Sequence, residues 1–263
     1  MKRLILAALL ATGFTGAAHA DDQLKAAIAG EHRSAANKAR DAHRHPYETL
    51  TFFGIKPNMT VVELAPSAGW YTEILAPYLR ERGKLVGAGE AIEPGKRYGL
   101  RFKQTLDSNA AIYDKVAIGV FEPPARYEIA APNSADMVLT FRNLHNWVGA
   151  GDEAVKTTFK EIHKVLKPGG VLGLVDHRLP ASMPQDAKAS SGYVHEAYVI
   201  KMAESAGFKL AAKSEINANP KDSANHERGV WTLPPVLANK DKDREKYMAI
   251  GESDRMTLKF VKQ

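Results

Sequence analysis

The fold is decided by residues 60–76, which read TVVELAPSAGWYTEILA. The first residues of this stretch are β-branched or apolar, as is typical of a short buried strand. Pro66 to Gly69 are turn-forming or small, and the segment from Trp70 to Arg82 has helical character. We predict a strand at 60–65 and a helix at 70–82. Such a junction brings backbone N–H groups and a helix N-terminus close to a ligand carboxylate, while Glu63 can meet an ammonium or hydroxyl group.

Outward from this junction, short apolar strands alternate with helices. A chain of this kind predicts an α/β fold with a doubly wound, mostly parallel sheet and right-handed crossovers. Further strands are expected at 84–88, 115–120, 135–141, 171–175, 208–216 and 256–261. Helices are expected before Leu106 and at 155–166 and 194–206.

Two segments lack this alternation, one before the first strand and one before the last. Residues 21–41 are rich in Ala, Lys, Arg and Glu and predict one N-terminal helix. A second helix is expected to begin at Pro46, which fits the first helical position, and to end before Gly54. Residues 217–251 are polar and proline-containing, without the strand–helix rhythm. A segment of this length inside a compact domain is usually a lid or disordered, and we predict a lid.

The N-terminus has the pattern of a secretory signal. Lys2 and Arg3 supply positive charge, residues 4–11 are apolar, and Ala18-His19-Ala20 fits a cleavage site. The apolar run is well short of the roughly 20 residues that a membrane span needs, and no later stretch is long enough. We therefore expect a cleaved signal at 1–20, no membrane span after cleavage, and a periplasmic or secreted product.

Composition excludes several classes of function. The formal charge of +6 falls to +4 without Lys2 and Arg3, and basic residues are scattered among acidic ones. Binding to nucleic acid is therefore unsupported. The chain has no cysteine, which excludes disulfides, thiolate zinc sites and cysteine nucleophiles.

Three stretches together resemble the class I S-adenosylmethionine-dependent methyltransferases. The loop at 63–69 is similar to the first motif of that family, residues 135–140 to its fourth strand, and residues 159–172 (FKEIHKVLKPGGVL) to its helix, turn and fifth strand. The last two predicted strands fit the family's reversed final strand. The resemblance extends from about Pro46 to Val261. Residues 143–147, 175–178 and 216–220 are similar to an exported bacterial branch of predicted methyltransferases.

The resemblance implies a seven-stranded Rossmann-like sheet and methyl transfer from S-adenosylmethionine. It does not identify the methyl acceptor, for which we expect a small molecule or a lipid. From this resemblance together with the residue patterns above, we divide the chain into a signal at 1–20, an N-terminal helical segment at 21–54 and a methyltransferase-like domain at 55–263, with the lid at 217–251. The cofactor-binding residues that the resemblance implies are Glu63, Ala65, Ser67, Gly69, Tyr71, Thr72, Glu90 and Asn143. The loop has one glycine where the family commonly has three. At the end of the second strand, Glu90 follows Gly89 near the place of the acid that binds ribose.

Candidate catalytic residues follow the fourth and fifth strands, because ligands bind beyond the carboxyl ends of the strands in open α/β sheets. His145 and His177 are candidate bases, since imidazole titrates near neutral pH, and Asp176 is a candidate orienting group. Trp147 fits either ligand stacking or the core. With Asn143, these side chains are also of the types that bind divalent ions, but they lack a tight ligand-spacing motif, and we predict no metal.

Two other functions fit parts of the sequence. Ala65-Pro66-Ser67-Ala68-Gly69 is a near match to the nucleophile motif of serine hydrolases, with Asp176 and His226 following in the right order. That motif normally comes after several strands, and no oxyanion segment precedes it here. A non-catalytic binding protein on the same fold is the other alternative, because the loop is poor in glycine and the cofactor is made in the cytoplasm.

Overall fold

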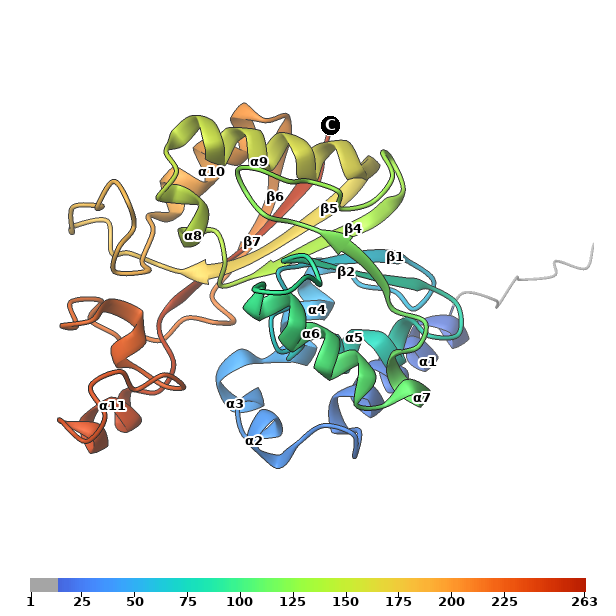
Figure 1. Ribbon diagram of the computed structural model, residues 1–263, viewed down its shortest axis with the longest axis horizontal. Helices are drawn as coiled ribbons and strands as arrows, with labels where there is room; N and C mark the ends of the chain where they lie inside the picture. Colours follow the sequence, from blue (N-terminus) through green and yellow to red (C-terminus); the bar gives the residue numbers. More distant parts are fainter. Residues whose placement is uncertain (1–13) are drawn as a thin grey trace, which may run out of the picture.

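The computed structural model describes residues 14–263, with side chains described from Ala20 onward. A seven-stranded sheet has the order β3-β2-β1-β4-β5-β7-β6 (Figure 1). β1 to β5 run parallel, and β7 is antiparallel to both β5 and β6. The strands are β1 (Thr60–Leu64), β2 (Lys84–Gly89), β3 (Ala117–Val120), β4 (Ala135–Phe141), β5 (Leu166–His177), β6 (Phe208–Ser214) and β7 (Arg255–Lys262). The predicted fold class is confirmed.

Helices cover both faces of the sheet (Figure 1). One layer holds α8 (His145–Val148), α9 (Asp152–Val165) and α10 (Glu196–Ser205). The other holds α1 (Phe14–Ala29), α4 (Pro46–Phe53), α5 (Thr72–Leu79), α6 (Arg97–Asp107) and α7 (Ala110–Tyr113). In α9, Val155, Phe159 and Ile162 are buried at helical spacing against the sheet. Each layer therefore has its own apolar core on one face of the sheet.

β5 begins earlier than the sequence predicts. The prediction places its start at Val171, whereas Leu166 is already extended and pairs with Ala135 of β4. Pro168 disfavours helical conformation at the residue before it, so α9 ends at Val165 and the chain continues directly into the strand.

The N-terminal segment differs more. The single helix predicted at 21–41 is wrong, because α1 ends at Ala29 and two short helices follow, α2 (Ala35–Lys38) and α3 (Asp41–Arg44). The chain turns after Gly30, and the Ser34 hydroxyl accepts a hydrogen bond from the N–H of Asn37 (3.2 Å) to start α2.

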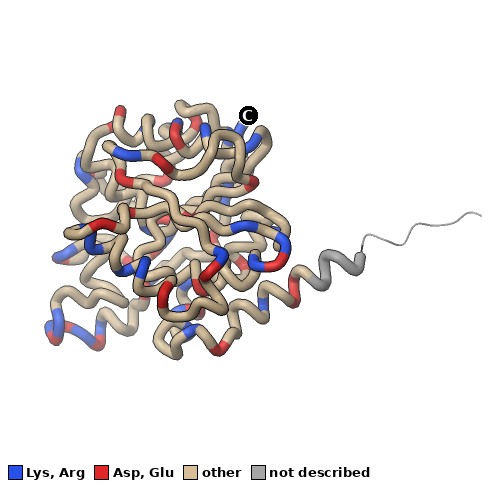
Figure 2. The backbone as a smooth tube through the Cα atoms, turned by 45° about the vertical axis from the view of Figure 1, so that its right-hand side comes forward, with Lys and Arg blue, Asp and Glu red and all other residues tan. Residues whose placement is uncertain are grey.

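Residues 1–13 of the predicted signal lie outside the described residues, and cleavage and export stay predictions. From Phe14 to the C-terminus, no helix combines the length and apolar character required to cross a membrane. Basic and acidic positions are interspersed over the backbone (Figure 2), as the sequence suggests.

The segment at 217–251, here called the lid segment, contains a short 3-10 helix, η1 (Gly229–Thr232), and α11 (Arg244–Ile250). It lies at the carboxyl end of β5 (Figure 1). Its anchor is the buried carboxylate of Asp222, which accepts hydrogen bonds from the Tyr193 hydroxyl (2.8 Å) and the backbone N–H of Asp254 (2.8 Å) and lies 2.8 Å from His226 Nε2. These contacts fix the lid segment to the start of β7.

Candidate functional site

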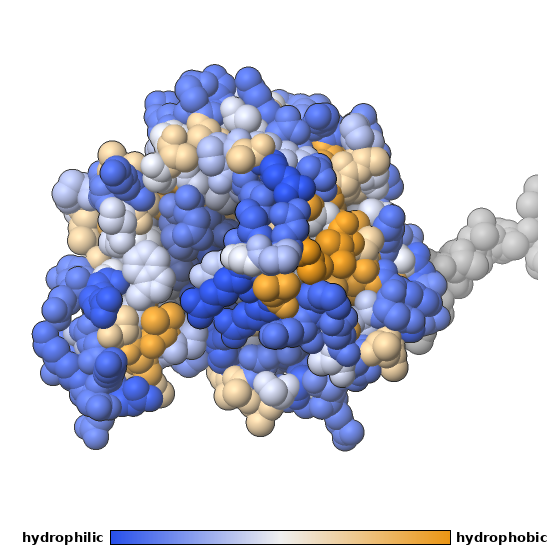
Figure 3. Space-filling model, in the orientation of Figure 1, coloured by the Kyte–Doolittle hydropathy of each residue, from blue (hydrophilic) through white to orange (hydrophobic). Residues whose placement is uncertain are grey.

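A cavity of about 780 Å³ opens at the carboxyl ends of β1, β4 and β5. The loop at 65–68 forms one wall, and Trp231, Pro235 and Val236 of the lid segment form part of another. On this face the surface is hollowed between the lid segment, at the lower left, and the body of the domain (Figure 3). The cavity occupies the position at which open α/β sheets bind ligands.

The loop after β1 has an unusual backbone. Ala65 (φ 46°), Ser67 (φ 53°) and Gly69 (φ 75°) all lie in the left-handed region, which is strained for the two non-glycine residues. The N–H of Gly69 donates to Pro66 O (2.8 Å), whereas the N–H groups of Ser67 and Ala68 have no acceptor within residues 14–263. Because Ser67 and Ala68 line the cavity, these two N–H groups are available to a bound anionic group.

Glu63 lies at the end of β1, buried at the floor of the cavity. Burial raises the pKa of its carboxyl group to about 7, although the Thr72 hydroxyl donates a hydrogen bond to it (2.6 Å). A ligand cation would favour the charged form, so the carboxyl suits a group such as an ammonium.

This raised pKa predicts a pH-dependent stability. Native Glu63 keeps its proton up to about pH 7, whereas the unfolded group releases it near pH 4.5. The native state therefore binds more protons in this interval, and stability falls by about 3 kcal/mol as pH rises through it. We expect Glu63→Gln to match the wild type near pH 4.5 and to be more stable by about 2–3 kcal/mol at pH 8. Denaturant titrations across this range measure the difference.

The exposed Glu48→Gln variant is the control and is expected to change stability by less than about 0.5 kcal/mol at every pH. A Glu63→Gln difference that does not vary with pH would contradict a protonated Glu63.

Glu90, directly after β2, lines the cavity. Its Oε2 accepts hydrogen bonds from the N–H groups of Tyr98 (2.6 Å) and Gly99 (3.2 Å) at the start of α6. A Cβ at position 99 would lie 2.0 Å from Ala91 O, so only glycine permits this close approach. Oε1 of Glu90 has no partner within residues 14–263, which leaves one carboxylate oxygen for a ligand hydroxyl.

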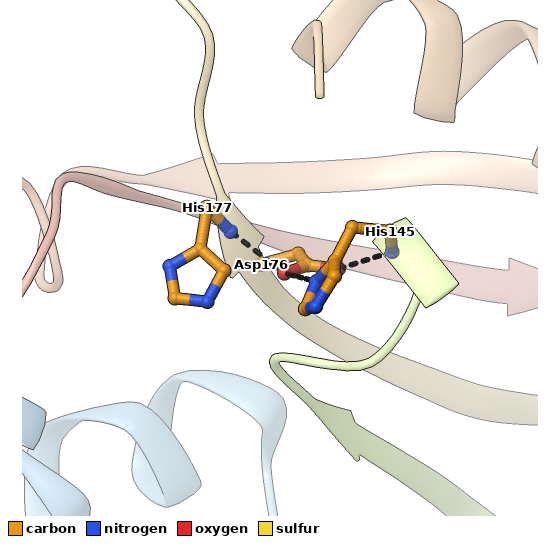
Figure 4. A group of neighbouring side chains, drawn as sticks. All are labelled: His145, Asp176 and His177. Carbon is orange, nitrogen blue, oxygen red and sulfur yellow. Dashed lines mark hydrogen bonds and ion pairs between the residues drawn. The ribbon is translucent and has the colours of Figure 1, made fainter. Parts of the chain in front are cut away.

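His145, Asp176 and His177 come together at the ends of β4 and β5, and all three are buried (Figure 4). Asp176 Oδ2 accepts from the N–H of His145 (3.0 Å), and Oδ1 accepts from the N–H of His177 (2.8 Å) and lies 3.0 Å from His145 Nδ1. The carboxylate thus fixes the His145 ring, with a proton on Nδ1 and Nε2 left as the acceptor. The sequence-predicted trio forms one hydrogen-bonded group.

His177 has different surroundings. Burial, and then the positive charge of Arg142, lowers the pKa of its ring well below the usual value, so the ring is neutral at physiological pH. Its Nδ1 lies 2.5 Å from the Ser253 hydroxyl. Ligand atoms of His145, Asp176 and His177 all lie within 4.8 Å of one another, close enough for a metal ion. Both Asp176 oxygens already accept N–H hydrogen bonds, which favours an orienting role.

A cluster of charged residues that sequence reasoning did not single out lies at the same end of the cavity. Glu252 Oε1 accepts from Arg40 Nε (2.9 Å), and Oε2 accepts from Arg44 Nε (3.2 Å) and Arg255 Nη1 (3.1 Å). Although burial opposes ionisation, the arginines lower the pKa of Glu252 to about 2. Arg40 and Arg44 are four residues apart, but nothing in that spacing distinguishes them from surface residues.

The remaining predicted residues have three kinds of placement. Tyr71 lines the cavity and stacks on Phe141 (3.5 Å between ring centroids), and Asn143 lines it with a buried Nδ2 that has no partner among the described residues. Gly69 and Thr72 do not line the cavity. The N–H of Gly69 closes the turn of the loop by its hydrogen bond to Pro66 O, and the Thr72 hydroxyl donates a hydrogen bond to Glu63. Trp147 is a core residue in edge contact with Phe121 and Phe159.

The serine hydrolase arrangement is not assembled in the described residues. Asp176 bonds to His145, and His226 bonds to Asp222, so the proposed acid and base belong to separate groups. No hydrogen bond joins Ser67 to a histidine within residues 14–263.

Comparisons with known proteins agree with this geometry. Residues 121–174 match the family described as "Methyltransferase domain". An S-adenosylmethionine-dependent methyltransferase from Aquifex aeolicus has a similar structure, with a TM-score of 0.56, 16% identity, and coverage of 85% of this chain and 92% of that one. No curated protein sequence matches the chain.

Two further structures are informative. The cyclase SpnF is similar with a TM-score of 0.58 and 13% identity, covering 94% of each chain. The methyltransferase CalH, in complex with SAH, is similar with a TM-score of 0.53 and 15% identity, covering 87% of this chain and 59% of that one. This protein therefore has the class I methyltransferase fold, on which a cyclase is also built.

Proposed function

We propose that the protein transfers the methyl group of S-adenosylmethionine to a small-molecule or lipid acceptor. The observation that carries the proposal is the cavity, which extends from the Ser67 and Ala68 N–H groups to His145 and His177. Its volume of about 780 Å³ suits a cofactor together with a small acceptor. The predicted signal at 1–20 supports action outside the cytoplasm.

The hydrogen-bond donors and acceptors of the cavity fit the cofactor. The free N–H groups of Ser67 and Ala68 suit its carboxylate, the Glu63 carboxyl suits its ammonium, and the free oxygen of Glu90 suits a ribose hydroxyl. The buried, unpartnered Nδ2 of Asn143 is a further donor. Because these groups line one cavity, a single ligand can contact all of them.

When bound, the cofactor supplies an electrophilic methyl group on a sulfonium, so the protein mainly has to align a nucleophile. His145 Nε2 is the group that takes a proton from an acceptor that must lose one, because Nδ1 is held by Asp176. Trp231, Pro235 and Val236 of the lid segment restrict access of water to the cavity.

Glu90→Ala tests the ribose assignment. The variant is expected to bind S-adenosylhomocysteine about 10–100-fold more weakly in calorimetric titrations, because a hydrogen bond to a charged group is lost. Glu93→Ala is the matched control, since Glu93 is exposed and does not line the cavity. Equal affinity of Glu90→Ala and the wild type would contradict the ribose assignment.

A non-catalytic binding protein on this fold is the alternative, motivated by the single glycine of the loop at 65–69. It is distinguished by turnover: such a protein binds the cofactor and leaves S-adenosylmethionine unchanged with every acceptor supplied.

A further inference from the structure

Four arginines meet at the acceptor end of the cavity. Arg40 and Arg44 belong to the α3 region, Arg142 follows β4, and Arg255 begins β7. All four line the cavity, although up to 215 positions separate them in the sequence. They are called the arginine cluster below.

Protein groups leave much of this cluster unpaired. Glu252 is the carboxylate that pairs with Arg40, Arg44 and Arg255, whereas Arg142 forms no ion pair and its side chain donates no hydrogen bond within residues 14–263. Nε of Arg142 and Nη2 of Arg40 are buried without a partner there. A guanidinium offers five N–H donors, so the cluster has donors in excess.

The charge balance points the same way. Within residues 14–263, Glu252 is the one carboxylate that forms ion pairs with these guanidinium groups. Asp176, whose charge also acts on Arg142, is already bonded to N–H groups of His145 and His177. Burial lowers the pKa of Arg44 to about 9 and that of Arg142 to about 10, which reflects incomplete compensation of their charges. Unpaired buried charge is costly, so a site that keeps it is suited to a ligand of opposite charge.

The carboxylate of the cofactor is one source of negative charge, but other groups already suit it. The free N–H groups of Ser67 and Ala68 face the cavity on the β1 side. Arg142 lies instead beside β5. Its backbone N–H donates a hydrogen bond to Val175 O (2.7 Å), next to Asp176 and His177. Its positive charge also acts on His177. The cluster therefore belongs with the candidate base residues.

From this arrangement, and building on the proposed function, we infer that the methyl acceptor is anionic. Arg142, assisted by Arg40 and Arg44, binds a carboxylate or phosphate group of the acceptor and holds it beside His145. Guanidinium groups bind both kinds of anion through paired N–H donors. Arg255 has a positioning role, because its side chain also bonds to the backbone oxygens of Ser253 and His43.

The test uses the whole protein, saturated with S-adenosylhomocysteine and titrated calorimetrically with phenyl phosphate, benzoate and the neutral probe benzyl alcohol. We expect the two anions to bind the wild type and to bind Arg142→Gln about tenfold or more weakly. Arg97→Gln is the matched control, because Arg97 is exposed and does not line the cavity. This control is expected to keep its affinity for both anions within about twofold of the wild type. The affinity for benzyl alcohol is expected to be the same for the wild type and both variants.

Two further readouts separate ligand binding from structure. Arg142→Gln is expected to be at least as stable as the wild type, because an unpaired charge is removed, and a clear loss of stability would overturn the inference. Its affinity for S-adenosylhomocysteine is expected to be unchanged. If that affinity falls while methylthioadenosine, which lacks the amino acid, binds normally, the cluster holds the cofactor carboxylate and the inference is wrong.

Absent or unchanged anion binding would also overturn the inference. Failure of the proposed function is distinguishable, because it appears as absent binding of S-adenosylhomocysteine to the wild type. In that case, titration of the free protein with the two anions still reports on the arginine cluster.

Discussion

Replacing Glu252 by Gln is expected to lower the free energy of unfolding by about 3–5 kcal/mol at pH 7, because it removes the carboxylate that Arg40, Arg44 and Arg255 share. Breaking a buried ion pair from one side leaves uncompensated charge, which costs more than the pair contributes. Urea titrations followed by circular dichroism measure this loss.

The effect has a defined pH dependence. The pKa of Glu252 is lowered from 4.5 in the unfolded chain to about 2, so its stabilisation is complete above pH 4.5 and is lost as pH falls towards 2. The difference between the wild type and Glu252→Gln should shrink over that range. Glu215→Gln is the control, because Glu215 forms an exposed pair with Arg178 and should contribute less than about 1 kcal/mol. Equal effects of the two substitutions would show that burial of Glu252 is unimportant.

Asp176→Asn is expected to have the largest effect on chemistry. The carboxylate accepts N–H hydrogen bonds on both oxygens, whereas an amide has one acceptor oxygen, so a backbone N–H of His145 or His177 would face an NH₂ group. We expect a loss of stability of about 2–4 kcal/mol. The amide oxygen is a weaker acceptor than a carboxylate oxygen, and the NH₂ group can face Nδ1 instead, so the tautomer of His145 is no longer fixed. The proposed methyl transfer to an acceptor that must lose a proton should then slow about 100-fold or more.

Nitrogen NMR of the His145 ring separates positioning from general stability. The wild type should show a proton on Nδ1, and Asp176→Asn should show a mixture or the opposite tautomer. Ser253→Ala is the matched control, because it removes a hydrogen bond to His177 and leaves His145 in place. An unchanged His145 tautomer in Asp176→Asn would contradict the positioning role.

Local sequence patterns predicted the sheet well. The strands at 60–65 and 135–141 lie within a residue of β1 and β4, because each is a short β-branched or apolar run bounded by turn residues. The reversed direction of the last strand came from family resemblance, since periodicity does not specify strand direction. The start of β5 was missed because the helix-then-KPGG pattern does not show where pairing to β4 begins.

The site was predicted in part. His145 follows β4, and Asp176 and His177 end the adjacent β5, so topology alone brings them together. Of the arginine cluster, Arg142 could be placed at the site because it follows the fourth strand. Arg40 and Arg44 could not be predicted, because they reach the cavity only through the turn after Gly30 that breaks the predicted helix. Glu252, their shared partner, lies more than 200 residues further along the chain.

The fold itself does not determine the reaction, because SpnF, a cyclase, shares it. The proposed methyl transfer therefore requires, first of all, that the cavity binds the cofactor.

Calorimetric titration of the folded wild type with S-adenosylhomocysteine tests this requirement most directly. We expect one site per chain with a dissociation constant of about 1–100 µM. Absence of binding by protein that unfolds cooperatively would contradict it.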